Sequence, residues 1–210
     1  MHTVVLLVDN DVLLSAAHWG LLDMVPTLVG ATWAEVAVLA SLPPRARKAD
    51  PKLFKDPAVA ATLVPYLAQC TPMPDPDVSL IARLQGRPDI DVGEQVLFAA
   101  TGGAAEAFVL TGDKRAIRAL ALLHAEGVIP ELTGRVLCME HLLWHALSVL
   151  GPDELLRRVR KYPDRDMATL AIVGRTEAKS QPQIEEGLTS YLMNLNQASP
   201  HLMARGHGLD

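Results

Sequence analysis

Four acidic side chains that stand next to apolar segments are the residues best suited to chemistry: Asp9, Glu35, Glu94 and Asp113. Carboxylate oxygens are good ligands for hard divalent cations, and crowded carboxylates repel one another unless a cation neutralises them. A bound cation lowers the pKa of a water molecule and stabilises negative charge on a phosphate. If the fold gathers these four acids, they indicate cation-assisted hydrolysis of a phosphate ester.

The first acid also fits a nucleophilic mechanism. Residues 8–12, Val-Asp-Asn-Asp-Val, resemble the strand end of haloacid-dehalogenase-type phosphatases. In those enzymes the first Asp, here Asp9, attacks phosphorus, and the second, here Asp11, acts as an acid or base. The same enzymes carry an acid four residues after the Asp of a Gly-Asp motif. Counted from Asp113 that residue is Ile117, so the phosphatase is the alternative interpretation.

Two histidines raise the question of zinc. His141 and His145 are four residues apart, a spacing with which one helix can chelate Zn²⁺. No acid directly follows His141 and the sequence offers no third ligand, so an ordinary helix at the edge of the core is favoured. A dinucleotide site has no support, because Gly102-Gly103 lacks the G-x-G-x-x-G pattern.

Hydrophobic patterning indicates the strands that must position the acids. Continuous apolar runs, rich in β-branched residues, precede Asp9 and Asp113 and are typical of buried parallel strands. Both acids would then lie just past the carboxyl ends of strands, where open α/β sheets bind their ligands. The pattern predicts strands over residues 3–8, 26–29, 107–111 and 135–138.

The other two acids are expected on helices. A helix that starts near Asp91 would carry Glu94 in its first turn, and Gly102-Gly103 would end it by supplying positive φ. Residues 32–39 read as another helix, in which Glu35 is the one acid in an apolar sequence. A buried lone Glu is costly, so Glu35 is expected either to be exposed or to share a partner with the other acids.

Basic residues form two local groups in a chain that is acidic overall. The net charge is -5, so no global basic field attracts nucleic acid. Residues 45–56 hold five basic and two acidic residues, a composition that is more often that of a solvated loop. Lys114, Arg115 and Arg118 lie on the first turns of a predicted amphipathic helix over residues 114–125. These three, and the 45–56 loop with them, are predicted to bind phosphates beside the acids.

Composition and cysteine content indicate the cellular context. The chain has 210 residues, 50% of them hydrophobic, which allows one large domain or one domain with an extension. Cys70 and Cys138, with no signal peptide, predict reduced thiols in the cytoplasm. No apolar run is long enough to span a bilayer, so no membrane association is expected.

The chain is expected to divide near residue 150. Residues 1–150 would form the domain that carries the acids, and residues 151–210 a helical C-terminal extension. The extension could pack on the core, form a homodimer surface or bind a protein partner, and packing on the core is favoured. The tail from residue 199 to residue 210 is expected to be loose.

The order of the four acids resembles that of the PIN-domain nucleases. Asp9 ends the first strand, Glu35 follows in an early helix, Glu94 ends an Asp-Val-Gly-Glu motif, and Asp113 ends a Leu-Thr-Gly-Asp motif. The resemblance covers about residues 3–145. It implies a parallel sheet sandwiched between helices and a ribonuclease whose carboxylates bind Mg²⁺ or Mn²⁺.

The overall prediction is an α/β fold: a PIN-like parallel sheet sandwiched between helices, with a helical C-terminal extension. The resemblance implies a cytoplasmic, metal-dependent ribonuclease in which the four acids are both catalytic and metal-binding. RNA would be bound by the three basic residues at 114, 115 and 118. Many family members are toxins of toxin-antitoxin pairs, which implies an antitoxin as protein partner. A PIN-like fold that serves only as an interaction module is the non-enzymatic alternative.

Overall fold

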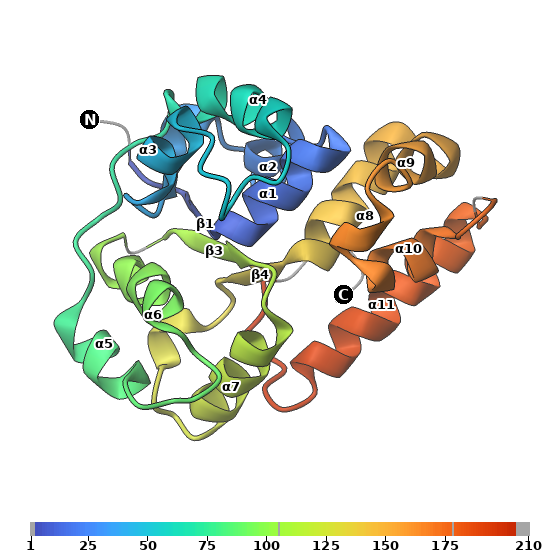
Figure 1. Ribbon diagram of the computed structural model, residues 1–210. Coiled ribbons are helices and arrows are strands. Elements are labelled where there is room, and N and C mark those ends of the chain that lie inside the picture. The colour runs from blue at the N-terminus through green and yellow to red at the C-terminus, as the bar shows by residue number, and fades with distance from the viewer. Residues whose placement is uncertain (1–2, 105, 178, 205–210) are drawn as a thin grey trace.

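A four-stranded parallel sheet forms the centre of the molecule (Figure 1). The computed structural model describes residues 3–104, 106–177 and 179–204. The strands lie in the order β2-β1-β3-β4, and every neighbouring pair is parallel. They are β1 (Leu6–Val8), β2 (Val36–Val38), β3 (Phe108–Thr111) and β4 (Val136–Cys138). The expected α/β class is therefore confirmed, and so are the expected strands that correspond to β1, β3 and β4.

Helices connect the strands and cover both faces of the sheet. Those from β1 to β3 are α1 (Asn10–Trp19), α2 (Met24–Thr27), α3 (Leu42–Arg47), α4 (Pro57–Leu67), α5 (Val78–Leu84) and α6 (Val92–Ala99). Those after β3 are α7 (Lys114–Ala125), α8 (Met139–Leu150), α9 (Pro152–Val159), α10 (Met167–Val173) and α11 (Gln181–Asn196). Figure 1 shows α1 to α4 on one side of the sheet and α5 to α7 on the other.

Each face of the sheet has its own apolar core. Leu6 and Val8 point into the core that contains α1, α4 and α8, whereas Leu7 points into the core formed with α5, α6 and α7. All three β1 side chains are fully buried, as expected for a central parallel strand covered on both faces. The continuous apolar sequence before Asp9 follows from this double coverage.

The extension packs into both cores. Leu155, Leu170 and Leu188 belong to the core that contains Leu6, and Leu192 belongs to the opposite core. Helix α11 thus crosses from one layer to the other and contacts both α8 and α7. Residues 151–204 consequently share their apolar contacts with the sheet.

Both edges of the sheet are covered by short backbone pairings. Beside β2, the Thr71 N–H donates to the carbonyl of Val36 at 2.9 Å. Beside β4, the Ala204 N–H donates to the carbonyl of Val136, also at 2.9 Å. The expectation of a loose tail is therefore wrong for residues 199–204, whose Leu202 is fully buried. Residues 205–210 of that tail lie outside the described part of the chain.

The segment between α1 and α3 differs most from its expected structure. Residues 26–29 were expected to form a strand, but Met24–Thr27 is helix α2. Residues 32–39 were expected to be helical, but one 3₁₀ turn, Trp33–Glu35, leads directly into β2. The apolar sequence Val-Ala-Val of β2 is buried beside β1, and this pairing overrides the helical pattern.

Gly102 and Gly103 are needed for a reason other than positive φ. Neither is among the positive-φ glycines of the described residues, and the helix continues beyond α6 as a 3₁₀ turn, Ala100–Gly103. A Cβ on Gly102 would lie 2.5 Å from Cβ of Asp77, and one on Gly103 would lie 2.8 Å from the carbonyl oxygen of Asp75. The two glycines therefore allow close packing against the segment before α5.

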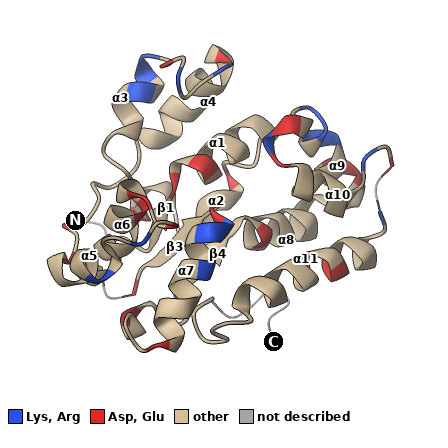
Figure 2. Ribbon diagram, turned by 60° about the horizontal axis from the view of Figure 1, so that its bottom comes forward, with Lys and Arg blue, Asp and Glu red and all other residues tan. Residues whose placement is uncertain are grey.

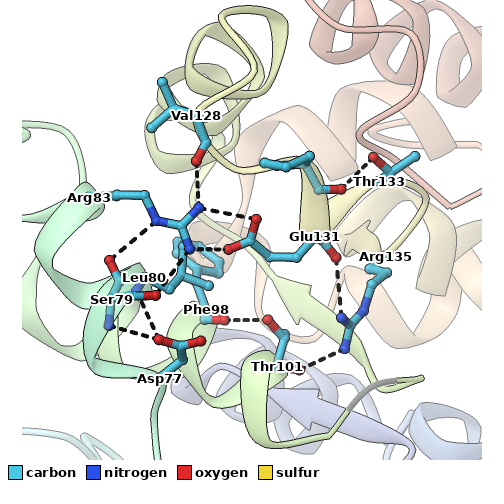
Figure 3. Close-up of polar contacts among 11 residues, drawn as sticks. Asp77, Ser79, Leu80, Arg83, Phe98, Thr101, Val128, Glu131, Thr133 and Arg135 are labelled. Carbon is cyan, nitrogen blue, oxygen red and sulfur yellow. Dashed lines mark hydrogen bonds and ion pairs between the residues drawn. The ribbon is translucent and has the colours of Figure 1, made fainter.

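A polar network at the amino ends of β3 and β4 fixes the position of α5 and α6 (Figure 3). Arg83 of α5 forms an ion pair with Glu131 and donates to the carbonyl of Val128 at 2.6 Å. Arg135, just before β4, donates to the carbonyls of Thr101 (3.0 Å), Ala104 (2.5 Å), Ala107 (2.8 Å) and Glu131 (3.2 Å). This network holds the helical block that carries Glu94 against the sheet.

Candidate active site at the carboxyl edge of the sheet

Three of the four predicted acids line one pocket. Asp9, Glu94 and Asp113 surround it, together with Asp11 and Asp91. Strands β1 and β3 are parallel neighbours, so the acids that follow them meet at the same edge of the sheet. The amino end of α6 faces this edge and adds its own carboxylates. The structure thus brings together five acidic side chains, and we call the pocket that they line the acidic pocket.

Asp9 is held by strand β3. Its Oδ2 accepts a hydrogen bond from the Thr111 hydroxyl at 3.3 Å, and the same hydroxyl accepts from the Asp113 backbone N–H at 3.2 Å. Burial raises the pKa of Asp9 to about 6, and repulsion from Asp11 adds to the effect. Thr111 therefore links the two acids that follow the central strands.

Glu94 and Asp91 form a reciprocal capping box at the start of α6. The Asp91 N–H donates to Glu94 Oε2 and the Glu94 N–H donates to Asp91 Oδ1, both at 2.8 Å. The second oxygen of each carboxylate has no hydrogen-bond partner among the described residues. Burial raises the pKa of Glu94 to about 7, and repulsion from Asp113, Asp91 and Asp9 contributes to the increase. All these acids are thus within electrostatic reach of one another.

Asp113 has a different environment because it caps α7. Its Oδ1 accepts from the backbone N–H groups of Arg115 (2.7 Å) and Ala116 (3.3 Å). Its Oδ2 lies 3.1 Å from the guanidinium of Arg115. Burial opposes ionisation here, but the hydrogen bonds from Arg115 outweigh it and hold the pKa of Asp113 below its usual value. Asp113 is therefore the acid of the pocket with the best-compensated charge.

Glu35 does not reach the acidic pocket, and this prediction is wrong. The register pairs Leu6 with Val36, so Glu35 precedes β2 at the amino edge of the sheet while Asp9 follows β1 at the carboxyl edge. Four residue steps of about 3.3 Å separate the two levels by roughly 13 Å. Glu35 Oε2 accepts from the backbone N–H (2.9 Å) and hydroxyl (2.8 Å) of Thr32, as a helix cap.

Two acids of the pocket were assigned too small a role from the sequence. Asp11 was introduced as the second acid of the phosphatase-like motif; in the structure Asp9 is the N-cap residue of α1, and Asp11 is exposed in the first turn and lines the pocket. Asp91 was expected only to begin α6. The Asp-x-x-Glu spacing that makes the capping box is the sequence signal that connects Asp91 to Glu94.

The three predicted phosphate-binding residues differ in their contacts. Lys114 Nζ lies 2.7 Å from Oε1 of Glu140, whose side chain is only 2% exposed, so the charge of Lys114 is already paired. The residue nevertheless lines a cavity beside Asp113. The Arg115 side chain is 76% exposed despite its ion pair with Asp113. Arg118 donates to Asn194 Oδ1 at 3.3 Å and, like Arg115, lines a pocket that also includes Arg87.

The two histidines of the zinc interpretation make separate contacts. His141 Nδ1 accepts from the backbone N–H of Cys138 at 3.1 Å, within the capping box of α8. His145 Nε2 lies 3.0 Å from the hydroxyl of Thr27. Across the described residues, no group of three or more His, Cys, Asp or Glu side chains is arranged to hold a metal ion. This finding applies both to the histidines and to the acidic pocket.

The fold and the site define an α/β protein with a parallel sheet and an acidic pocket at its carboxyl edge. No family model, no curated protein and no solved structure matches the chain. Within the described part of the chain, no helix is both long and apolar enough to cross a membrane.

Proposed function

We propose that this chain is a PIN-like, metal-dependent ribonuclease that hydrolyses RNA phosphodiester bonds at the acidic pocket. One observation carries the proposal: Asp9, Glu94 and Asp113 line a single pocket at the carboxyl edge of the sheet. Burial and mutual repulsion raise the pKa of Asp9 and of Glu94 there. A cation that neutralised these carboxylates would remove the energetic cost of ionising them.

The donor set fits a hydrated hard cation. All five side chains of the pocket offer oxygen atoms, the ligands that Mg²⁺ and Mn²⁺ prefer. Mg²⁺ usually keeps several water molecules and takes only one or two carboxylates together with substrate phosphates. A site of that kind needs no preformed group of three ligands, so Asp9 and Glu94, with Asp91 beside them, would suffice to hold the ion. When bound, it would lower the pKa of a water molecule and stabilise charge on the phosphate.

The protein itself orients the acids and binds the substrate. The Thr111 hydroxyl fixes Asp9, and the capping box fixes Glu94, so neither carboxylate has to be ordered when RNA binds. Arg115, which pairs with Asp113, and Arg118, which lines a neighbouring pocket with Arg115, are both exposed and are the residues proposed to bind phosphates. A toxin role with an antitoxin partner rests on the PIN resemblance alone, whereas a cytoplasmic location is proposed from the two cysteines.

A phosphatase is the second candidate, because Asp11 shares the pocket with Asp9. In that mechanism Asp9 would attack phosphorus and Asp11 would act as acid or base. Glu94 would then have no direct role. A small phosphomonoester hydrolysed equally well by wild type and Glu94→Gln, or an aspartyl-phosphate analogue trapped on Asp9, would favour the phosphatase.

The decisive experiment compares Mn²⁺ binding and cleavage of a labelled RNA across four variants. Asp9→Asn, Glu94→Gln and Asp113→Asn should each lose both activities by a large factor, with strongly non-additive effects in combination. Glu35→Gln is the matched control, because it is an equally conservative change at the opposite edge of the sheet. A wild-type protein that neither binds Mn²⁺ nor cuts RNA would overturn the proposal and favour a non-catalytic interaction module.

A further inference from the structure

A second pocket lies next to the acidic pocket and has two aromatic rings and several apolar side chains in its lining. Leu14 and His18 of α1 form one side of it, Leu53 of the α3–α4 connection another, and Tyr162, just after α9, a third. We call it the aromatic pocket. Its volume of about 550 Å³ falls within the range of roughly 300–1,000 Å³ found for small-molecule sites.

The two aromatic rings of this pocket, those of His18 and Tyr162, pack against each other. The His18 and Tyr162 ring centroids are 4.7 Å apart with an interplanar angle of 81°, an edge-to-face contact. His18 is held in turn by a 2.6 Å contact between its Nδ1 and the carbonyl of Leu14. Aromatic rings fixed in this way offer a surface on which a planar, unpaired base can stack.

Four basic residues line the aromatic pocket, together with the acids Asp11, Asp56 and Asp164. Lys52, Lys55 and Lys161 line it and are exposed. In the described part of the chain, none of the three lies within ion-pair distance of a carboxylate. One of the lining acids, Asp56, is occupied in capping α4 through a 2.9 Å hydrogen bond from the Ala58 N–H. Figure 2 shows these basic segments on the α3–α4 connection and after α9.

The aromatic pocket adjoins the acidic pocket, because Asp11 and Leu53 line both of them. A third cavity shares Asp11 and Asp113 with the acidic pocket, and it shares Arg165 with the aromatic pocket. The Arg165 guanidinium donates to the hydroxyl of Ser15 at 3.3 Å. Arg165 thus places a cation in the wall of the aromatic pocket and of the cavity that reaches Asp113.

We propose that the aromatic pocket binds one base of an unpaired RNA strand, while a phosphate further along that strand is cleaved in the acidic pocket. Arg165 binds a phosphate between the two, and the three lysines attract the strand. This inference rests on the proposed ribonuclease function. It gives the C-terminal extension a role in substrate binding, because Lys161, Tyr162 and Arg165 all belong to it. A base inside a duplex cannot enter the pocket, so the site selects single-stranded RNA.

The test measures binding of a short fluorescent single-stranded RNA by anisotropy, with Asp9→Asn in every protein so that no RNA is cut. Tyr162→Leu should weaken binding about tenfold, the effect of losing one stacked base, whereas Tyr162→Phe should not. The double change Lys52→Glu with Lys161→Glu should weaken it further at low salt. The matched control, Arg175→Glu with Lys179→Glu, makes the same charge change at exposed residues outside the pocket and outside the 45–56 loop.

The outcomes distinguish a failure of the base-site proposal from a failure of the ribonuclease proposal. If Tyr162→Leu and the lysine double variant bind like the control, or if a duplex of equal length binds as tightly, the aromatic pocket is not a base site. AMP binding as tight as that of the oligonucleotide would make it a site for free nucleotides and overturn the strand model. Cleavage is measured in parallel with Asp9 intact: a wild type that binds through Tyr162 but cuts no RNA would refute only the ribonuclease. Circular dichroism checks that each variant is folded.

Discussion

The ammonium group of Lys114 lies 2.7 Å from the buried carboxylate of Glu140 and 4.5 Å above the ring centroid of Tyr191. This relationship joins the start of α7, the start of α8 and the middle of α11. Burial opposes the charge on Lys114, but Glu140 outweighs it and keeps the pKa of Lys114 above its usual value. The residue next to Asp113 therefore helps to anchor the extension.

Breaking this ion pair from one side should destabilise the protein strongly. Lys114→Met leaves the Glu140 carboxylate buried without its cation, and Glu140→Leu leaves Lys114 partly buried without its anion. Either change should lower the free energy of unfolding by roughly 3–5 kcal/mol, as for other buried pairs that lose one partner. Urea unfolding measures the loss. The double variant removes both charges and should recover most of it, whereas additive losses in the double variant would contradict the pairing.

The acidic pocket should make stability depend on pH. The folded protein raises the pKa of Asp9 from 3.8 to about 6 and that of Glu94 from 4.5 to about 7. The uncharged carboxyl groups therefore favour folding below about pH 4, and this contribution is lost as the pH rises through 6 and 7. The loss is at most about 3 kcal/mol for each group.

Glu94→Gln tests this dependence, because glutamine keeps the capping acceptor but cannot ionise. Without divalent cations, the variant should be more stable than wild type at pH 8 and about equally stable at pH 4, as measured by urea unfolding. Added Mn²⁺ should stabilise the wild type more than the variant at pH 8. Equal stability of the two proteins at pH 8 would show that Glu94 ionises there without cost.

Arg115 and Arg118 should contribute salt-sensitive RNA binding. Each phosphate contact to a single strand contributes about 0.7 to the slope of log affinity against log salt concentration. Arg115→Glu and Arg118→Glu should each weaken binding at low salt and reduce that slope by about this amount. Arg175→Glu, an exposed residue of the α10–α11 connection, is the control. An unchanged slope in all three proteins would show that the two arginines are exposed to solvent and do not contact RNA phosphates.

The strands that place Asp9 and Asp113 could be predicted from sequence because each is a continuous apolar run. A strand that is buried on both faces of a sheet requires such a run. The helix that carries Glu94 was predictable from its acidic cap. Glu35 was misplaced because β2 has only three residues, and a run that short does not distinguish a buried strand from a helix. Its pairing with β1, about thirty residues earlier, decides the structure.

The partners of the basic residues were also out of reach of sequence reasoning. Lys114 lies in the first turn of an amphipathic helix, a position that suits phosphate binding. Nothing in the neighbouring sequence indicates that its charge is neutralised by Glu140, which is 26 residues away. The aromatic pocket likewise depends on a contact between His18 and Tyr162, which are far apart in sequence. Contacts of this kind, between residues far apart in the sequence, are known only once the chain is folded.

The pairings at both edges of the sheet restrict how this protein can associate. Thr71 occupies part of the free edge of β2, and the segment ending at Ala204 covers that of β4. Open strand edges are the usual templates on which further chains add by backbone hydrogen bonding. With these edges blocked, a second copy or a partner protein has to dock through helix surfaces. Residues 203–204 thus protect the edge strand β4 from sheet-to-sheet aggregation, a role separate from any in catalysis.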